Sequence, residues 1–186
     1  NVGNCYSMPR TAVTATVTDV PTISTSIDGD RCEAGAVILG ASASSGTVNW
    51  YTVSSDGSSV STGTSYTTPD INSTTTYYVD ATDNNCTTGS RTAVTATINP
   101  NPTVTLTLSP DAVCEGTGST ALSGGSPNGG TYSGTGVSGG DIDPSAVGVG
   151  NSATITYIYT DGNGCANSAT DDFSVTPALD AGTIKF

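Results

Sequence analysis

The chain repeats one of its own segments, and this repeat limits what it can fold into more than any other feature. The word Arg-Thr-Ala-Val-Thr-Ala-Thr at residues 10–16 returns 81 residues later at residues 91–97, and a cysteine precedes each copy. Two further matches follow nearly the same spacing: residues 21–23 with 102–104, and Cys32-Glu33 with Cys114-Glu115. A period of about 80 residues is too long for a solenoid and suits a series of small independent domains. We therefore interpret the sequence as part of a longer array of such domains.

Alternating patterns predict short β-strands joined by turns. Residues 10–17 alternate Val13, Ala15 and Val17 with threonines, which indicates a strand with one buried face. Further strands are expected at residues 36–41, 47–53, 74–82, 91–98, 104–108, 120–123, 153–160 and 173–175. No stretch has helical periodicity. The predicted fold class is all-β, with tandem β-sandwich domains.

The charge of the chain excludes two classes of partner. Sixteen acidic residues face four basic ones, which gives a net charge of −12. Such a chain cannot neutralise a phosphate backbone, so we expect no nucleic acid as a partner. An anionic membrane surface would repel it, and no apolar run approaches the length of a membrane span, so we expect no membrane insertion of this segment.

Several segments resemble known surface-protein modules. Residues 47–51, 63–69, 74–79 and 86–97 resemble the Ig-like repeats of very large Bacteroidota surface proteins. Residues 124–134, followed by residues 157–165, look like the PKD-like repeats found beside them. The resemblance implies tandem Ig-like and PKD-like sandwiches in an extended array, export by the type IX pathway, and a place in long adhesins that include gliding-motility adhesins.

The repeat and the resemblance together predict four segments. Residues 1–20 would be the last strand of a preceding Ig-like domain, and residues 21–101 an Ig-like β-sandwich. Residues 102–178 would be a PKD-like or Ig-like β-sandwich, and residues 179–186 the first strand of a following domain. Asn99-Pro100-Asn101-Pro102 is typical of a short, stiff linker.

The predicted function is structural: a non-enzymatic shaft segment of a large adhesin or filament at the cell surface, with neighbouring repeats of the same chain as partners. Other domains would contact surface or glycan ligands. The chain has no histidine, and we predict no catalytic residue. The alternative is a glycan-binding or surface-binding accessory module of a secreted polysaccharide-active protein. Outward aromatic side chains on the strand of Tyr77 and Tyr78 motivate it.

Few residues qualify as ligands. Asp141, Asp143 and Asp161 lie in turns where carboxylate and carbonyl oxygens can converge, and they are the candidate calcium ligands. No other cofactor is expected. Trp50, the only tryptophan, is expected in the core of the first full unit, because a lone tryptophan on the third strand of an Ig-like sandwich usually packs there.

Strand direction bears on the choice between two sets of disulfides. Pairing in order would join Cys32 to Cys86 and Cys114 to Cys165, but these cysteines lie at opposite ends of a sandwich, about 20 Å apart. A disulfide needs Cα atoms within about 7 Å. Consecutive units instead bring Cys32 to Cys165, so this staple is slightly favoured. Under either pairing, the partner of Cys5 lies outside the chain. Cysteines paired in this way indicate an oxidising, extracellular location.

Overall fold

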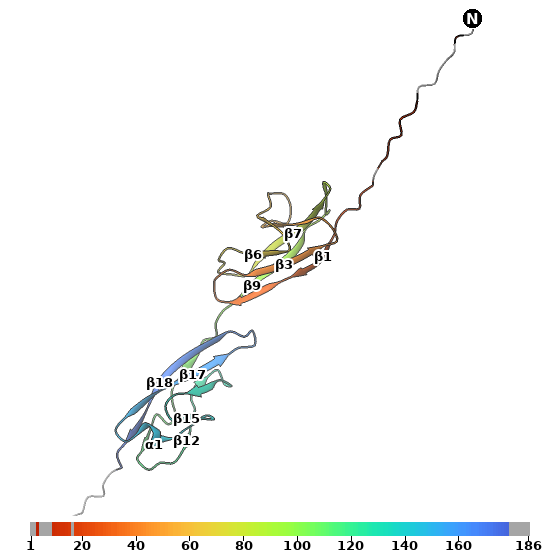
Figure 1. The fold of residues 1–186 in the computed structure, drawn as a ribbon. Helices are drawn as coiled ribbons and strands as arrows, with labels where there is room; N and C mark the ends of the chain where they lie inside the picture. The colour runs from red at the N-terminus through yellow and green to blue at the C-terminus, as the bar shows by residue number, and fades with distance from the viewer. Residues whose placement is uncertain (1–2, 4–8, 16, 179–186) are drawn as a thin grey trace, which may run out of the picture. The chain divides into compact units, whose positions relative to one another are not determined.

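The computed structural model describes residues 3, 9–15 and 17–178 (Figure 1). Its described part is almost entirely β, which confirms the predicted all-β fold class. Contacts divide the chain into two compact units. The first unit comprises Asn1–Gly29, Ile38–Thr68 and Thr75–Ala96, and the second comprises Asp30–Val37, Pro69–Thr74 and Thr97–Phe186.

Two sheets account for the strands up to residue 99. One is antiparallel with strand order β1-β3-β6: β1 (Ile23–Ile27), β3 (Ile38–Ala43) and β6 (Ser65–Thr67). The other has the order β2-β9-β7-β4-β5, with β8 paired to β7: β2 (Gly29–Cys32), β4 (Thr47–Tyr51), β5 (Ser61–Thr62), β7 (Thr75–Asp83), β8 (Cys86–Thr87) and β9 (Thr92–Asn99). Most of β2 and the end of β9 belong to the second unit.

Aromatic side chains build the centre of the first unit. Trp50 is fully buried, and its indole N–H donates to the Gly63 carbonyl at 2.8 Å. Its ring stacks on Tyr66 at 5.5 Å between centroids, and Tyr66 meets Tyr77 edge-on at 5.3 Å. Burial raises the pKa of both tyrosines above its ordinary value. The sequence analysis expected Trp50 in the core of this unit.

The second unit is built on one long hairpin, β17 (Ser152–Thr160) with β18 (Ala166–Thr176). The main sheet has the order β11-β18-β17-β14, with β11 (Ala112–Cys114) parallel to β18 and β14 (Thr131–Ser133) antiparallel to β17. Short strands complete the fold: β10 (Thr105–Leu106), β12 (Thr120–Ala121), β13 (Gly125–Ser126), β15 (Val137–Ser138) and β16 (Asp141–Ile142).

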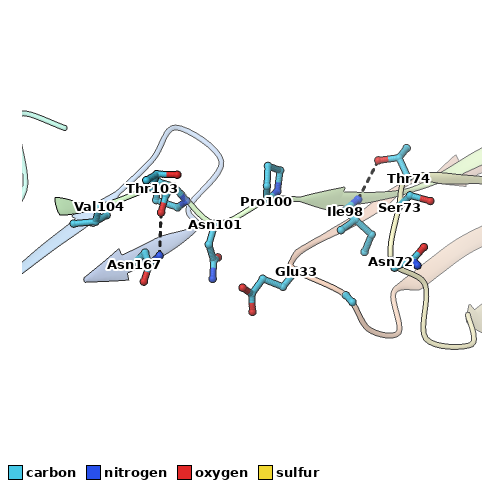
Figure 2. Close-up of a pocket in the computed structure, with 12 residues that line it drawn as sticks. Glu33, Asn72, Ser73, Thr74, Ile98, Pro100, Asn101, Thr103, Val104 and Asn167 are labelled. Carbon is cyan, nitrogen blue, oxygen red and sulfur yellow. Dashed lines mark hydrogen bonds between the residues drawn. The ribbon is translucent and has the colours of Figure 1, made fainter. Parts of the chain in front are cut away.

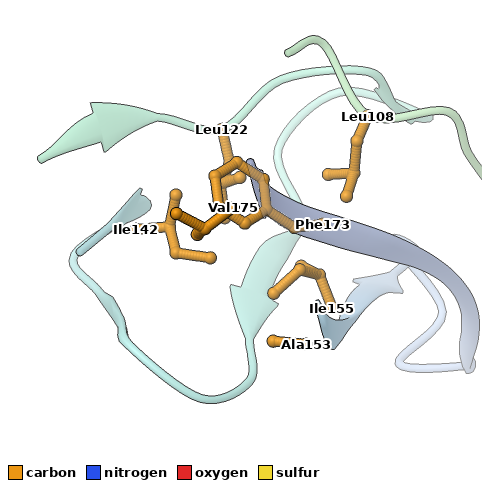
Figure 3. Close-up of a cluster of buried hydrophobic side chains, with 7 residues drawn as sticks. All are labelled: Leu108, Leu122, Ile142, Ala153, Ile155, Phe173 and Val175. Carbon is orange, nitrogen blue, oxygen red and sulfur yellow. The ribbon is translucent and has the colours of Figure 1, made fainter. Parts of the chain in front are cut away.

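The core of the second unit surrounds Phe173, which is completely buried (Figure 3). It belongs to a cluster of buried side chains that come from both hairpin strands and from earlier segments of the unit: Leu108, Leu122, Ile142, Ala153, Ile155 and Val175. Ala153 and Ile155 are two residues apart on β17, as Phe173 and Val175 are on β18. The period-two pattern therefore buries one face of each strand.

The secondary structure differs from the sequence analysis in two places. Residues 9–15 and 17–20 form no strand, and Val13 and Val17 are each 92% exposed. A strand is stable only when its backbone N–H and C=O groups pair with a neighbour, and no described strand pairs with this segment. The assignment of residues 1–20 to a preceding domain remains a prediction. Cys5 and the predicted strand at residues 179–186 lie outside the described residues.

The second difference is a short helix, α1 (Pro144–Val147). Asp143 caps its N-terminus and proline occupies its first turn, both favoured there. A helix of four residues is too short to show a helical period in the sequence.

Candidate functional site

The strongest candidate for a functional feature is a disulfide between Cys32 and Cys165. The two Cα atoms are 5.5 Å apart, and 133 residues separate the cysteines in the sequence. Cys32 ends β2, and Cys165 lies in the turn between β17 and β18. Cys86 and Cys114 are free, so neither of the pairs Cys32–Cys86 and Cys114–Cys165 is present.

Backbone hydrogen bonds fix the segment that carries Cys32. The Glu33 N–H donates to the carbonyl of Asn99, the last residue of β9, at 2.8 Å. Gly35 and Ile71 exchange N–H···O bonds of 2.9 and 3.1 Å. Gly35 has φ +150°, and a Cβ there would lie 2.0 Å from the Arg31 guanidinium. These contacts hold the end of β2 against β9 and against residues 69–74.

Asp161 fixes the turn that carries Cys165. Its carboxylate accepts the N–H groups of Asn163 and Cys165, both at 2.9 Å. Its own N–H donates to the Cys165 carbonyl at 2.9 Å. The Cys165 sulfur is therefore presented from a turn closed at both ends.

A cavity of about 720 Å³ lies beside these segments in the second unit (Figure 2). Its lining comes from four stretches of chain and includes Glu33. The lining is rich in amides and hydroxyls, among them Asn72, Thr74, Asn101 and Asn167. The Asn167 amide donates to the Pro102 carbonyl at 3.0 Å, and Ile98 N–H donates to the Thr74 hydroxyl at 3.1 Å. Glu33 is the only ionisable residue in the lining, so the cavity offers hydrogen bonds rather than an acid–base pair.

A second polar cluster lies in the first unit, around Asp80 and Arg91. Only 6% of the Asp80 side chain and 12% of the Arg91 side chain are exposed, and the closest N···O distance is 3.4 Å. Asp80 also accepts from the Asn49 amide at 2.8 Å and from the Tyr51 hydroxyl at 3.3 Å. The guanidinium lies 3.3 Å from the centre of the Tyr51 ring.

In this second cluster Arg91 is bonded to its own loop, and a cavity of about 230 Å³ borders Asp80 and Arg91. Arg91 Nη1 donates to the carbonyls of Val53 and Asp56, at 2.9 and 2.6 Å, which ties the β4–β5 loop over the carboxylate. Burial, and then the hydrogen bond to Asp80, raise the pKa of Tyr51. The sequence analysis did not single out Asp80 or Arg91 as a pair. The available signal was an arginine at the start of the repeated word.

The candidate calcium ligands lie in three different local settings. Asp143 accepts from the N–H and hydroxyl of Ser145 at 2.9 and 2.7 Å, and these bonds lower its pKa. Asp161 closes the hairpin turn, and Asp141 lies in β16 opposite Ala121 and Ser138. Within residues 3, 9–15 and 17–178, no three His, Cys, Asp or Glu side chains gather around a common point. The structure therefore does not bring the three aspartates together as a metal site.

Tyr77 and Tyr78 point to opposite faces of β7. Tyr77 is buried in the aromatic core, whereas Tyr78 is half-buried on the other face, opposite Tyr51 of β4. The outer face that motivated the ligand-binding alternative thus carries a partly exposed tyrosine beside the Arg91 cluster. Across the described part of the chain, no helix is long and apolar enough to span a membrane.

Comparison with known families gives one match. Residues 19–100, less than half of the chain, match the model of the family "Ig-like domain CHU_C associated". The matched segment includes Trp50, the Asp80–Arg91 pair and Cys32. The fold is Ig-like. No curated protein matches the sequence.

Solved structures show weaker likenesses. Extracellular domains 3–5 of Drosophila OTK share 13% identity at a TM-score of 0.42, with 85% of this chain and 62% of that chain covered. A Ca²⁺-stabilised adhesin with which an Antarctic bacterium binds ice shares 15% identity at a TM-score of 0.45, with 86% and 49% covered. This chain thus spans less than two thirds of either one. These scores are too low to support an argument about function.

Proposed function

We propose that this chain is a shaft segment of a large extracellular adhesin or filament: a non-enzymatic spacer whose partners are neighbouring repeats of the same chain. The observation that carries the proposal is the Cys32–Cys165 disulfide. It joins Cys32, in the segment that matches the Ig-like family, to Cys165, in the β17–β18 hairpin, and we assign these two segments to consecutive repeats. A cross-link between consecutive repeats serves spacing and stiffness, which are the properties of a shaft.

Three further observations support a structural role. The sequence has no histidine, the 720 Å³ cavity has one ionisable lining residue, and Asp80 and Arg91 pair with each other while Arg91 also bonds to its own loop. A site for acid–base or nucleophilic chemistry needs at least two cooperating groups open to substrate. Disulfides persist in oxidising compartments, which supports an extracellular location.

The finer assignment rests on the resemblance of the repeats. We propose that residues 102–178 are a PKD-like or Ig-like module, that the protein is exported by the type IX pathway, and that it reaches the cell surface in an adhesin of the gliding type. Mass spectrometry of surface and culture fractions from the native host should find peptides of this chain outside the cell. Their restriction to the cytoplasm would refute the assignment.

Small-angle X-ray scattering tests the shaft itself. The chain should scatter as a rod whose cross-section is one sandwich wide, and its maximum dimension should remain constant across salt concentrations. A compact particle with the two repeats folded together would overturn the proposal.

A second candidate function is recognition of a glycan. The amide-rich and hydroxyl-rich lining of the 720 Å³ cavity favours it, because such groups suit sugar hydroxyls. A glycan array would give hits lost on Asn167→Ala if the cavity binds sugar, or on Tyr78→Ala if the outer face does. An array with no hits would contradict glycan recognition and leave the spacer role as the proposed function.

A further inference from the structure

Cys86 and Cys114 each occupy the position of one member of the bonded pair. Cys114 is followed by Glu115, as Cys32 is followed by Glu33. Glu115 N–H donates to the carbonyl of Thr176, the last residue of β18, at 2.8 Å. The Glu33 amide makes the same bond, at the same length, to the last residue of β9. Cys114 is exposed at this position, whereas Cys32 is bonded.

Cys86 matches Cys165 in the same way. Each lies between the last two long strands of its repeat, Cys86 between β7 and β9 and Cys165 between β17 and β18. Each follows a turn that begins with aspartate, Asp83 or Asp161. The two thiols that remain free in the described chain are therefore the hairpin half of one junction and the Cys-Glu half of another.

The chain that enters the first repeat supports this placement. The Thr18 hydroxyl lies 3.5 Å from the Cys86 sulfur. Thr18 stands three residues before Pro21, as Asn99 stands three residues before Pro102. Asn99 is the residue that bonds beside Cys32. The segment that enters the first repeat therefore passes close to Cys86. By the same spacing, the Cys-Glu pair of a preceding repeat would lie at this point.

We propose that Cys86 and Cys114 are the open ends of a continuous disulfide series, in which every repeat is bonded to the next. Cys114 takes the hairpin cysteine of a following Ig-like repeat, and Cys86 takes the Cys-Glu cysteine of a preceding one. This inference rests on the proposed shaft function. In each bond two thiols lose two protons and two electrons, and a small disulfide oxidant such as oxidised glutathione accepts both and becomes two thiols.

A fusion of the chain to itself provides the test, because the chain carries both halves of a junction. Residues 1–178 joined directly to residues 21–186 place Thr176-Pro177-Ala178 before Pro21, which reproduces the spacing of Asn99-Pro100-Asn101 before Pro102. After refolding with oxidised glutathione, non-reducing peptide mapping should find Cys114 of the first copy bonded to Cys86 of the second. Both thiols should then be protected from iodoacetamide.

Two controls separate the outcomes. Cys114→Ser in the first copy should return iodoacetamide labelling to Cys86 of the second copy and leave both Cys32–Cys165 bonds intact. A fusion in which Cys114 stays reduced while both Cys32–Cys165 bonds form would overturn this inference and leave the shaft proposal standing. Formation of a Cys32–Cys86 bond in the unfused chain would instead overturn both this inference and the shaft proposal.

Discussion

The guanidinium of Arg91 contacts three kinds of group at once: the Asp80 carboxylate, the Tyr51 ring, and the carbonyls of Val53 and Asp56. Because both charges are nearly buried, each depends on the other for solvation. Arg91→Ala would leave a buried carboxylate with only neutral partners. We expect a loss of about 3 kcal/mol in the free energy of unfolding, measured by urea denaturation.

Arg10 offers a matched control, because it begins the other copy of the repeated word and is exposed. Arg10→Ala should change the free energy of unfolding by less than about 0.5 kcal/mol. Arg91→Lys should fall between the two, since an ammonium keeps the charge but not the planar fork that reaches both carbonyls. Equal stabilities of Arg91→Ala and Arg10→Ala would show that the network is not stabilising.

Asp143 should make the stability of the fold depend on pH. The hydroxyl and N–H of Ser145 lower its pKa below the ordinary value, so folding favours the ionised form. A carboxylate with a lowered folded pKa stabilises the protein above its unfolded pKa, and this contribution is lost as the pH falls through the folded value. Wild type should be more stable than Asp143→Asn at neutral pH, and the difference should shrink below about pH 4. Denaturation of both proteins at several pH values measures it, and a gap that stayed constant down to pH 2 would contradict the assignment.

At the scale of elements, the glycine-rich stretch before β17 is shaped by Tyr157. The hydroxyl of this buried residue donates to the Pro127 carbonyl at 2.5 Å and accepts Gly130 N–H at 2.7 Å. A Cβ on Gly130 would lie 2.4 Å from the Ile158 carbonyl oxygen and 2.5 Å from the Tyr157 ring. The glycine is therefore required for close approach of the chain to the ring.

Gly130→Ala should lower the free energy of unfolding by about 1–3 kcal/mol, because either β14 or the Tyr157 ring must move. Gly162→Ala is its control: a Cβ there meets nothing within 4 Å, and the residue lacks a positive φ. It should be close to neutral. Thermal denaturation of the two variants in parallel makes the comparison, and a neutral Gly130→Ala would mean that the stretch yields without cost.

The repeated word shows what a local pattern can and cannot predict. Residues 10–16 and residues 91–97 have the same sequence. Residues 91–97 lie largely within β9, whereas residues 10–16 form no strand where they are described. β9 pairs with β7 along Thr75–Val79, whereas no described strand pairs with residues 9–15. The alternation predicts which face is buried, but the partner decides whether a strand exists.

The same reasoning explains the other successes and failures. β7, β9 and β17 were predicted close to their bounds because each is long and alternates apolar with polar residues. The two-residue strands β13, β15 and β16 have no room for a pattern, and distant residues set their pairing. The contact between Asp80 and Arg91 likewise depends on the register of β7 and on the folding of the β4–β5 loop.

At the scale of the whole molecule, the sequence favoured Cys32–Cys165 because a disulfide obeys a firm distance limit. It could not reveal the hydrogen bonds that place Glu33 and Asp161 around the two cysteines, since these depend on turns whose conformation the pattern leaves open. The cavity beside Glu33 was missed for a related reason: its lining comes from four separate stretches of chain.

The Cys32–Cys165 bond has a proposed mechanical role, which reduction of the bond tests. If Cys32–Cys165 staples consecutive repeats, reduction should loosen the chain at residues 99–102 while each sandwich stays folded. The buried cores around Trp50 and Phe173 would not change, so the melting temperature should hardly move. A disulfide that closed a loop within one sandwich would instead stabilise that sandwich by about 2–4 kcal/mol, and its reduction would lower the melting temperature.

Energy transfer between two dyes, at the exposed Ser58 in the first unit and the exposed Thr117 in the second, separates these outcomes. Mild reductant should broaden the distribution of dye-to-dye distances without changing its temperature dependence below the melting transition. The variant that carries both Cys32→Ser and Cys165→Ser should show the same broadening with no reductant present, which excludes effects on Cys86 and Cys114. A large fall in melting temperature with an unbroadened distribution would mean that the bond stabilises a fold instead of restricting a hinge. A hinge role predicts a wider distribution of dye-to-dye distances, whereas a role in folding predicts a lower melting temperature. Both quantities can be measured on one labelled protein, which therefore decides between the two roles.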